Sequence, residues 1–447
     1  MMKNVFFLVS LLLFFICSNA TNYTVATLRT VRAATNTTYT TTDFGGGSWT
    51  LSTTDVSSAD NTGTVIVTST NQRLKRVYSG NINMLWFGLI GDGTDETVKI
   101  QNALTVAAGH TITIPAGTFS TGKIGVSSGT TIVGTTGSKF KMIQGANDNI
   151  MLSLWYVSNV DISGIELDLT GITGNIYDGT AALQMQGCSN IRIHSCYIHD
   201  NAYVGIRLTG GNTNIIVDHN FIKNTDTGVH CNNLNANVTI KNNTIYGGTS
   251  EGVTVYGYSQ ALQPYGFLID SNSIVHKDGS FGINIPYARQ CVISNNNIDS
   301  CWGGVLLHDV VSTGVEALYT SRVVINNNSI AAVGFGIEFV GDSTKITNNT
   351  ISSIRQDGIN INNFTNASIY TTADTVSNNT IVSPGVSGGG RGGISFRNLT
   401  NSTISNNFIT NCGAQFAIRI DGGCSNLIIL GNKQDGIIQL LSGVTIN

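Results

Sequence analysis

The sequence predicts an all-β chain folded as a parallel β-helix, a solenoid built from stacked coils of short strands. Two recurring phrases and a low proline content predict this fold class. The first phrase reads apolar residue, two residues, asparagine, one residue and usually isoleucine. Its asparagines are Asn220, Asn243, Asn272, Asn296, Asn328, Asn349, Asn379, Asn407 and Asn432. A constant phrase at a variable spacing of 21 to 32 residues indicates one coil per repeat, with the length differences placed in loops.

The second phrase reads glycine, apolar residue, any residue, apolar residue, as in Gly205–Leu208 and Gly252–Val255. It alternates at the period of a β-strand, so we expect two or three short strands in each coil. The chain has only 4 prolines, which suits uninterrupted ladders because proline cannot donate a backbone hydrogen bond. At a strand spacing of about 4.8 Å, ten or more coils would give a body about 50–60 Å long.

The N-terminus has the features of an export signal. Lys3 precedes an apolar run over residues 5–16, and Ser18-Asn-Ala20 provides the small residues of a cleavage site. We therefore interpret residues 1–20 as a signal peptide and expect a secreted protein, extracellular or periplasmic, with no stable membrane insertion after cleavage. Residues 21–83 are rich in Ser and Thr and are expected to form a β lead-in segment of unknown role.

The repeat region opens with Trp86-Phe-Gly-Leu-Ile-Gly-Asp-Gly-Thr-Asp-Glu-Thr-Val-Lys-Ile-Gln101. This stretch resembles the phrase that begins the β-helix domains of the pectate-lyase (pectin-lyase-like) superfamily, although it is one residue shorter between Gly93 and Asp95. The resemblance covers residues 84–447. It implies a right-handed, single-stranded parallel β-helix, a fold shared by polysaccharide-degrading enzymes and phage tailspikes. Right-handed connection is also the general rule for parallel crossovers.

The same stretch has the residues of a helix start. Thr94 or Asp95 could cap free backbone N–H groups. The apolar face of the helix would consist of Val98, Ile100, Ala103, Leu104 and Ala107. A short helix at this point would cover the otherwise open edge of the first coil.

We expect the recurring asparagine to be architectural. Asparagine tolerates left-handed bends, and stacked side-chain amides can hydrogen-bond from one coil to the next. The row is therefore interpreted as a scaffold for the turns and not as a row of catalytic groups.

The composition excludes several function classes. Charged residues make up 11% of the chain, the net charge is −3 and no basic run is present, so no nucleic-acid partner is expected. The chain has 8 cysteines, of which Cys17 lies in the expected signal peptide. Five others fall at recurring positions of the phrases, as Cys188 and Cys424 do in Cys-Ser-Asn, and the cysteines are interpreted as small apolar side chains and not as a disulfide framework. We expect no cofactor, and no zinc because the sequence has no zinc-type spacing. Ca²⁺ stays open as an alternative, although no dense acidic cluster supports it.

The middle residue of each glycine phrase is expected to point outward, since alternate residues of a strand face opposite sides. These positions form a strip of amides, hydroxyls and a few charges, which suits a long hydroxylated polymer. The expected partner is therefore a polysaccharide, whereas the oligomeric state cannot be read. The residues expected to bind it are Gln184, Asn232, Asn284 and Asn360.

The coils over residues 199–256 carry the most reactive groups on this strip. Arg207 could neutralise a uronate carboxylate, His230 could remove the adjacent proton, and Tyr256 could protonate the leaving oxygen. This set predicts a polysaccharide lyase that cleaves an acidic glycan by β-elimination. Tyr203 lies on the same coils and belongs to the candidate catalytic set.

Two other functions remain open. Asp226 and Glu251, also in the candidate catalytic set, could flank a glycosidic bond as the paired carboxylates of a glycoside hydrolase, as could Glu338 with Asp357. A non-catalytic surface or tailspike-like protein would use the polar strip only to bind glycans.

Overall fold

The computed structural model describes most of the chain and divides it into two compact units. The described residues are 22–143, 150–172, 180–200, 203–257, 262–277, 279–286, 289–307, 320–331, 334–361, 370–385, 392–412 and 416–440. The expected signal peptide, residues 1–20, lies outside them. One unit is Met1–Ser79 with Trp86–Gly88, and the other is Gly80–Leu85 with Leu89–Asn447. No helix within the described ranges is long and apolar enough to cross a membrane.

The N-terminal unit is a small β-sheet with the strand order β1-β2-β3-β5-β4. The elements are β1 (Asn22–Tyr23), α1 (Val25–Leu28), β2 (Thr38–Thr41), β3 (Gly47–Leu51), β4 (Val65–Val67), β5 (Arg73–Val77) and part of the 3₁₀ helix η1 (Met84–Phe87). The β1–β2 pair is parallel and the other pairs are antiparallel.

The core of this unit is centred on Trp49, which is fully buried. The Trp49 indole N–H donates a hydrogen bond to Oγ1 of Thr41 at 3.1 Å. The guanidinium of Arg76 lies over the rings of Trp49 and Trp86, at 4.4 and 4.7 Å from the ring centres. Burial lowers the pKa of Arg76 to about 10, although the group stays charged at neutral pH.

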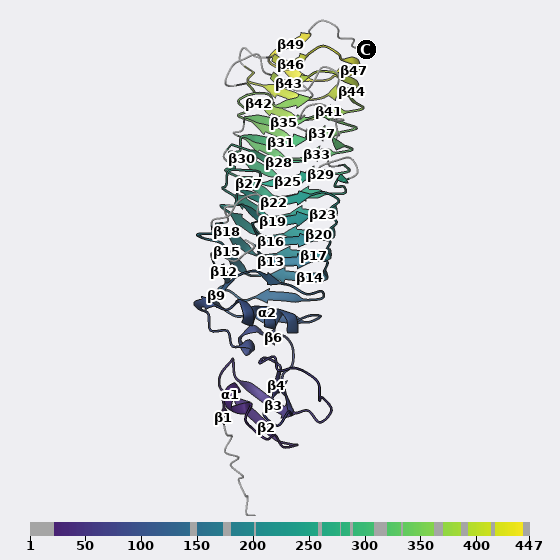
Figure 1. Ribbon diagram of the computed structural model, residues 1–447. Helices are drawn as coiled ribbons and strands as arrows, with labels where there is room; N and C mark the ends of the chain where they lie inside the picture. Colours follow the sequence, from purple (N-terminus) through teal and green to yellow (C-terminus); the bar gives the residue numbers. More distant parts are fainter. Residues whose placement is uncertain are drawn as a thin grey trace, which may run out of the picture. The chain divides into compact units, whose positions relative to one another are not determined.

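The second unit is a parallel β-helix made of three long sheets (Figure 1). Sheet I contains β10 (Ile124–Gly125), β13 (Ile150–Trp155), β16 (Ala181–Gln186), β19 (Val204–Thr209), β22 (Thr227–Asn232), β25 (Val253–Tyr256), β28 (Phe281–Asn284), β31 (Gly303–Leu307), β35 (Phe335–Phe339), β39 (Ile359–Ile361), β43 (Gly392–Phe396), β46 (Phe416–Ile420) and β49 (Ile437–Leu440). The glycine phrase lies at β19, β22, β25, β28, β31, β35, β39 and β43.

Sheets II and III complete each coil. Sheet II contains β6 (Ile82–Asn83), β8 (Thr111–Ile114), β11 (Thr131–Gly134), β14 (Ser158–Ser163), β17 (Ser189–His194), β20 (Thr213–Asp218), β23 (Ala236–Lys241), β26 (Leu268–Asp270), β29 (Val292–Ser294), β33 (Val324–Asn326), β37 (Lys345–Thr347), β40 (Thr371–Thr372), β41 (Thr375–Ser377), β44 (Leu399–Ser405) and β47 (Ser425–Leu430). Sheet III contains β7 (Asp92–Asp95), β9 (Gly117–Thr121), β12 (Ser138–Met142), β15 (Glu166–Asp168), β18 (Tyr197–His199), β21 (Phe221–Lys223), β24 (Thr244–Tyr246), β27 (Ser273–Val275), β30 (Asn297–Asp299), β34 (Ser329–Ala331), β38 (Thr350–Ser352), β42 (Thr380–Val382), β45 (Phe408–Thr410) and β48 (Lys433–Gln434). A further parallel pair is β32 (Thr320–Ser321) with β36 (Gly341–Asp342).

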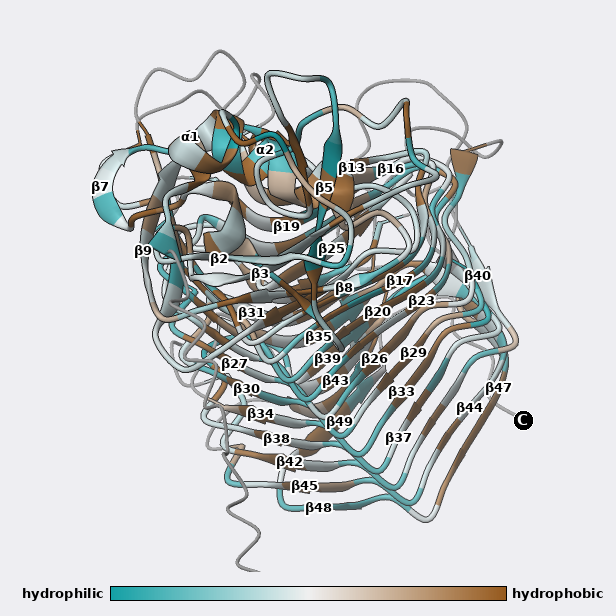
Figure 2. Cartoon of the chain, turned by 90° about the horizontal axis from the view of Figure 1, so that it is seen from below, coloured by the Kyte–Doolittle hydropathy of each residue, from teal (hydrophilic) through white to brown (hydrophobic). Residues whose placement is uncertain are grey.

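The fold prediction is confirmed, because each strand pairs in parallel with its counterparts in the adjacent coils. Figure 2 shows the strands of successive coils lying over one another. Inward positions are aliphatic and fully buried, as at Ile206, Leu208, Val217 and Ile222. The alternation predicted from the sequence therefore produces one continuous apolar core.

The predicted capping helix is present as α2 (Thr97–Val106) and packs on the first coils. The Gln101 side chain pairs with the edge of β10: its Nε2 donates to the Gly125 carbonyl at 3.1 Å, and its Oε1 accepts from the Gly125 N–H at 2.7 Å. Of the expected helix caps, Asp95 accepts a hydrogen bond from the Thr97 N–H at 2.9 Å, whereas the hydroxyl of Thr94 bonds to Asp92.

One part of the expected apolar face of α2 is wrong. Val98 is 81% exposed, because its side of the helix faces away from the coils, whereas Ile100, Ala103, Leu104 and Ala107 are fully buried. The stretch before the helix forms the short strand β7.

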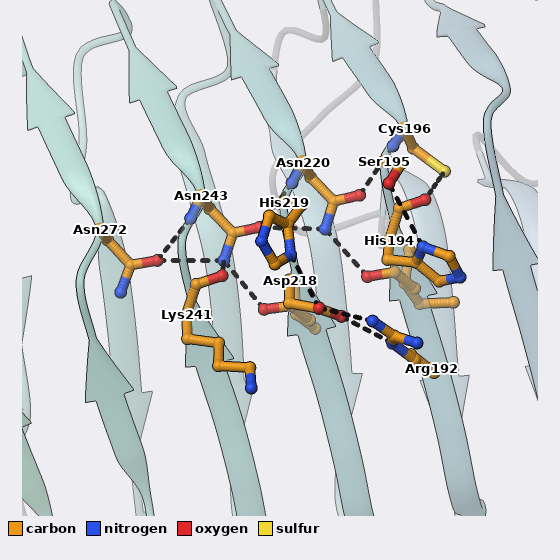
Figure 3. A network of polar contacts seen from close by, with 12 residues as sticks. Arg192, His194, Ser195, Cys196, Asp218, His219, Asn220, Lys241, Asn243 and Asn272 are labelled. Atoms are coloured by element: carbon orange, nitrogen blue, oxygen red, sulfur yellow. Dashed lines mark hydrogen bonds and ion pairs between the residues drawn. The ribbon is translucent and has the colours of Figure 1, made fainter.

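The asparagine row forms the predicted ladder (Figure 3). Oδ1 of Asn243 accepts hydrogen bonds from both the backbone N–H and the Nδ2 of Asn220, each at 3.0 Å. Nδ2 of Asn220 also donates to the carbonyl of Ile193 at 2.9 Å. The same pattern links Asn272, Asn296, Asn328, Asn349, Asn379, Asn407 and Asn432 in turn. Each amide therefore satisfies backbone groups at a buried turn as well as its neighbour in the ladder.

The left-handed bend occurs one residue earlier than expected. The residues that directly precede the ladder asparagines have positive φ, as His219 (φ 56°), Asn242 (φ 54°) and Ser271 (φ 55°) do. The ladder asparagines themselves are absent from the described residues with positive φ. The tight bend turns the following side chain inward, which leaves its amide free to stack.

The glycine and isoleucine of the two phrases meet in one contact that closes each coil. A Cβ on Gly228, which opens a coil, would lie 2.7 Å from Cγ2 of Ile245, which ends the same coil. At Gly252 the corresponding distance to Cγ2 of Ile274 is 2.4 Å. The same contact recurs for Gly282 with Ile298, Gly304 with Ile330, Gly336 with Ile351, Gly358 with Ile381 and Gly393 with Ile409. Glycine is required at this position because the isoleucine occupies the space of its side chain.

The cysteines in the described part of the chain are buried and free, as the repeat positions predict. Cys196 takes a ladder position, where its backbone N–H donates to Oδ1 of Asn220 at 3.0 Å. Burial raises the pKa of the Cys196 and Cys291 thiols to about 12.

We predict that Asn296→Ala lowers the free energy of unfolding by about 3 kcal/mol, because it leaves two buried donors of Asn272 without their acceptor at a cost of about 1–3 kcal/mol each. Asn297→Ala is the matched control, since Asn297 is exposed on the neighbouring position of β30. Denaturant unfolding of both variants measures the difference. Equal effects of the two substitutions would show that the ladder amides add no stability of their own.

Candidate functional site

The outward positions of sheet I form one continuous column, named here the sheet I column. Backbone pairing aligns Gln184 with Arg207, Arg207 with His230, and His230 with Thr254. Arg207 and His230 are therefore neighbours on strands about 4.8 Å apart. The column continues through Asn284, Leu306, Glu338, Asn360, Ser395 and Arg419.

The column is more enclosed than the open strip that the sequence suggests. Gln184 is only 8% exposed and Asn360 is fully buried, whereas Asn232 and Asn284 are partly exposed. Within the described residues, neither amide atom of Asn360 has a hydrogen-bond partner, and Oε1 of Gln184 also lacks one. A buried polar atom without a partner is unfavourable by about 1–3 kcal/mol. Asn360 has no exposed surface, so the expected contact between its amide and a substrate is not available in this structure.

His230 has the most perturbed environment of the column. The pKa of His230 is lowered to about 4: burial is the largest cause, the positive charge of Arg207 acts in the same direction, and the carboxylate of Glu251 opposes both effects. The imidazole is therefore neutral at neutral pH. A neutral imidazole can accept a proton from a substrate.

Glu251 supplies the carboxylate of this cluster. Its Oε1 accepts a hydrogen bond from Nδ2 of Asn284 at 3.2 Å, and its Oε2 accepts one from the Ser250 hydroxyl at 2.5 Å. Burial alone would raise the pKa of Glu251, but these hydrogen bonds outweigh it and lower the pKa. Glu251 is held as an anion, and the amide of Asn284, expected to bind substrate, is engaged with it.

Tyr203, Asp226 and Glu251 lie at the turns that lead into sheet I in three successive coils. The carbonyl of Tyr203 accepts a hydrogen bond from the Thr227 N–H at 2.8 Å, and that of Asp226 accepts one from the Ser250 N–H at 3.1 Å. These contacts place the three residues along one edge of sheet I, beside the start of the strands that carry Arg207 and His230.

Lys277 lies behind this edge and was not found by sequence reasoning. Its side chain is fully buried, and its Nζ donates to the carbonyls of Thr225 at 2.9 Å and Asp226 at 3.3 Å. Burial lowers the pKa of Lys277 to about 8, and the charge of Asp226 opposes this effect. A signal existed in the sequence, since Lys277 occupies the position five residues after a ladder asparagine that Cys301 takes in the next coil.

A second column runs beside the first and contains Tyr256. Backbone pairing aligns Trp155 with Gln186, then Thr209, Asn232 and Tyr256. Trp155 is 49% exposed and can stack on a sugar ring. Sequence reasoning missed it because its strand has no opening glycine, and the phrase was therefore not recognised there.

One group among the described residues has the donors of a metal site. The ligand atoms of Glu166, Asp168 and His199 lie within 4.8 Å of one another. However, Nζ of Lys139 lies 2.6 Å from Glu166 and 3.6 Å from Asp168. The two ring nitrogens of His199 contact Glu166 at 3.0 Å and Asp200 at 2.8 Å. The single ammonium forms ion pairs with both carboxylates, and both ring nitrogens of His199 are engaged, so the group is a network of ion pairs and hydrogen bonds across the outer face of sheet III.

Two family models match the chain. The model described as right handed beta helix region matches residues 142–263, 261–371 and 335–446. The model described as phage tail protein small four-stranded beta-sheet domain matches residues 23–79, within the N-terminal unit. The first match covers most of the second unit.

Solved structures with a similar fold belong to proteins of different classes. The surface adhesin PfbA of Streptococcus pneumoniae is 17% identical with a TM-score of 0.60, over 83% of this chain and 93% of that chain. The catalytic unit of an α-1,3-glucanase from Streptomyces thermodiastaticus is 14% identical with a TM-score of 0.58, over 84% and 74%. Full-length tailspike protein 2 of an Escherichia coli O157:H7 bacteriophage is 15% identical with a TM-score of 0.53, over 95% and 51%. This chain thus spans about half the length of that tailspike.

We predict that His230 makes the stability of the fold depend on pH. Its pKa is about 4 in the folded chain and about 6.5 in an unfolded one, so the unfolded chain binds the proton more readily between these values. The free energy of unfolding should therefore fall as the pH decreases from about 6.5 to about 4, and His230→Gln should remove this part of the fall. Urea unfolding across this range measures it. His110→Gln, at an exposed position, should keep the dependence of the natural protein; a His230→Gln chain that also keeps it would contradict the assignment.

Proposed function

Because the chain belongs to the family of right-handed β-helix regions, in the pectin-lyase-like superfamily, we propose that it acts outside the cell on a polysaccharide and cleaves an acidic glycan by β-elimination. The observation that carries this proposal is the pairing of Arg207 with a half-buried, neutral His230 on adjacent strands. This pair offers an anion-binding group and a base at the separation of one coil.

The proposed reaction uses the groups of the two columns. Arg207 binds the carboxylate of a uronate unit, and His230 removes the proton from the carbon that bears this carboxylate. The electron pair of the broken C–H bond forms a C=C bond, the C–O bond to the next sugar breaks, and Tyr256 gives its proton to the departing oxygen. A bound carboxylate would also cancel the charge of Arg207 that lowers the pKa of His230. Substrate binding would therefore make the base stronger.

Hydrolysis by Asp226 and Glu251 is less well supported. A glycoside hydrolase needs one carboxylic acid whose pKa is raised, so that it can protonate the leaving oxygen. Glu251 has the opposite property, since hydrogen bonds from Ser250 and Asn284 lower its pKa. In the other candidate pair, Glu338 with Asp357, Asp357 is fully buried and accepts hydrogen bonds from the Gly392 N–H and the Ser395 hydroxyl. Its carboxylate is therefore engaged inside the chain.

A tailspike-like binding protein is the second candidate function. The match of residues 23–79 to a phage tail protein domain favours it, as do the fold likenesses to a tailspike and an adhesin. In that case the polar columns and Trp155 would hold a glycan without cleaving it. The two candidates share the glycan partner and differ in whether a product appears.

We predict that an acidic polysaccharide incubated with the protein yields products with the ultraviolet absorbance of a C=C bond conjugated to a carboxylate. His230→Ala and Tyr256→Phe should each lower kcat by about 10²-fold or more, because each removes a proton-transfer group. Tyr246→Phe, on the outer face of sheet III, is the matched control and should keep full activity. New reducing ends without this absorbance would indicate hydrolysis, and binding without any product would leave the binding protein.

We propose that the reaction needs no metal ion, and we predict that activity survives exhaustive chelation. The Arg207 guanidinium supplies the positive charge beside His230, and the carboxylates of Glu166 and Asp168 already form ion pairs with Lys139. Activity before and after dialysis against a chelator measures this. Loss of activity that Ca²⁺ restores would show that a cation, and not Arg207 alone, neutralises the substrate.

A further inference from the structure

A cavity of about 570 Å³ lies beside the residues that precede strands β26, β29, β33 and β37 of sheet II, away from the Arg207–His230 pair. Its lining includes Tyr265, Arg289, Ser321, Arg322, Asp342 and Ser343. Its volume falls in the range of about 300–1,000 Å³ that is usual for small-molecule sites. Neither the asparagine ladder nor the proposed elimination makes use of these residues.

The coil register builds this cavity. Isolated bridges pair Tyr265 with Arg289, and Arg289 with Ser321, on three successive coils. The parallel pair β32–β36 then aligns Ser321 with Asp342. Arg322 directly follows Ser321, and its backbone N–H donates to the Asp342 carbonyl at 3.0 Å. The two arginines therefore project from adjacent coils into one cavity, close enough to contact a single ligand.

The described lining of the cavity has two arginines and one carboxylate, that of Asp342, so the cavity has a net positive charge. Neither the Arg289 nor the Arg322 guanidinium forms a hydrogen bond or an ion pair within the described part of the chain. The carboxylate of Asp342 instead accepts a hydrogen bond from the Thr372 N–H at 3.1 Å. Burial raises the pKa of Asp342, which is the reverse of the effect that a close guanidinium would have.

The remaining lining residues indicate what kind of anion would fit. Two guanidinium groups suit a planar carboxylate or a sulfate ester, which they bind through several charge-assisted hydrogen bonds. The ring of Tyr265 is 40% exposed and can pack against a sugar ring. The hydroxyls of Ser321 and Ser343 can hydrogen-bond sugar hydroxyls. The carboxylate of Asp342 would repel a polyphosphate, which favours a ligand with one negative charge per sugar unit.

We propose that this cavity is a second binding site for an acidic glycan, which holds one uronate or sulfated sugar unit against Arg289, Arg322 and Tyr265. The proposal shares with the proposed function only the acidic nature of the glycan. It would bind the polymer outside the two sheet I columns, so that the chain contacts its substrate at two places along the β-helix.

The test is a calorimetric titration of the full chain with oligosaccharides of a polyuronate, of a sulfated glycan and of the same polyuronate with its carboxylates reduced. It is done in the His230→Ala background, so that no ligand is cleaved. We expect Arg289→Gln with Arg322→Gln to weaken binding of one acidic ligand at least 10-fold and to leave binding of the reduced ligand unchanged. Lys345→Gln with Lys433→Gln removes the same charge from exposed positions on β37 and β48 and should have no such effect.

The two acidic ligands distinguish a uronate site from a sulfate site, because the affected ligand identifies the anion. Unchanged binding of both acidic ligands by the arginine variant overturns the proposal, and so does an equal loss in the lysine control. The result is independent of the elimination reaction. A chain without lyase activity that loses acidic binding in the arginine variant keeps the cavity and loses the proposed function. A chain with lyase activity whose arginine variant binds both acidic ligands normally keeps the proposed function and loses the cavity proposal.

Discussion

The closure of each coil onto a buried turn is the constraint on which the structure depends. A coil must turn from one sheet to the next within a few residues, and backbone groups at that turn lack a partner in the strands. The ladder amide supplies both a donor and an acceptor there: Oδ1 of Asn243 accepts from the Asn220 N–H, and Nδ2 of Asn243 donates to the Val217 carbonyl. The isoleucine two residues later then packs where the opening glycine has no side chain, as Ile245 does against Gly228. Hydrogen bonding thus fixes the turn between sheets II and III, and packing fixes the contact of sheet III with the start of sheet I.

The fold could be predicted because the period of the sequence is the period of the structure. The glycine phrase places Arg207 beside His230 without any knowledge of three-dimensional contacts, and the backbone pairing agrees. Features that depend on a particular side chain could not be predicted in this way. The enclosure of Asn360, the engagement of Asn284 with Glu251 and the exposed Trp155 depend on loops and contacts that do not repeat.

The candidate site is also the place where this chain departs from its own pattern. The core positions are aliphatic or small, yet Lys277 puts an ammonium where the next coil has Cys301. Burying an ammonium such as that of Lys277, or partly burying groups such as Glu251 and His230, is unfavourable unless they are paired, and a scaffold does not need them. Because the fold carries many chemistries, this local departure is better evidence of function than the β-helix itself.

The buried cysteines have a practical consequence for how this molecule can be observed. A thiol reacts as the thiolate, and burial holds the pKa of Cys196, Cys291 and Cys412 at about 11–12, so these groups are almost entirely protonated near neutral pH. They also lie far apart along the axis of the β-helix. Each thiol therefore reacts with an alkylating reagent only when its own coil unfolds. Alkylation followed by mass spectrometry would therefore map, coil by coil, the order in which the stack comes apart.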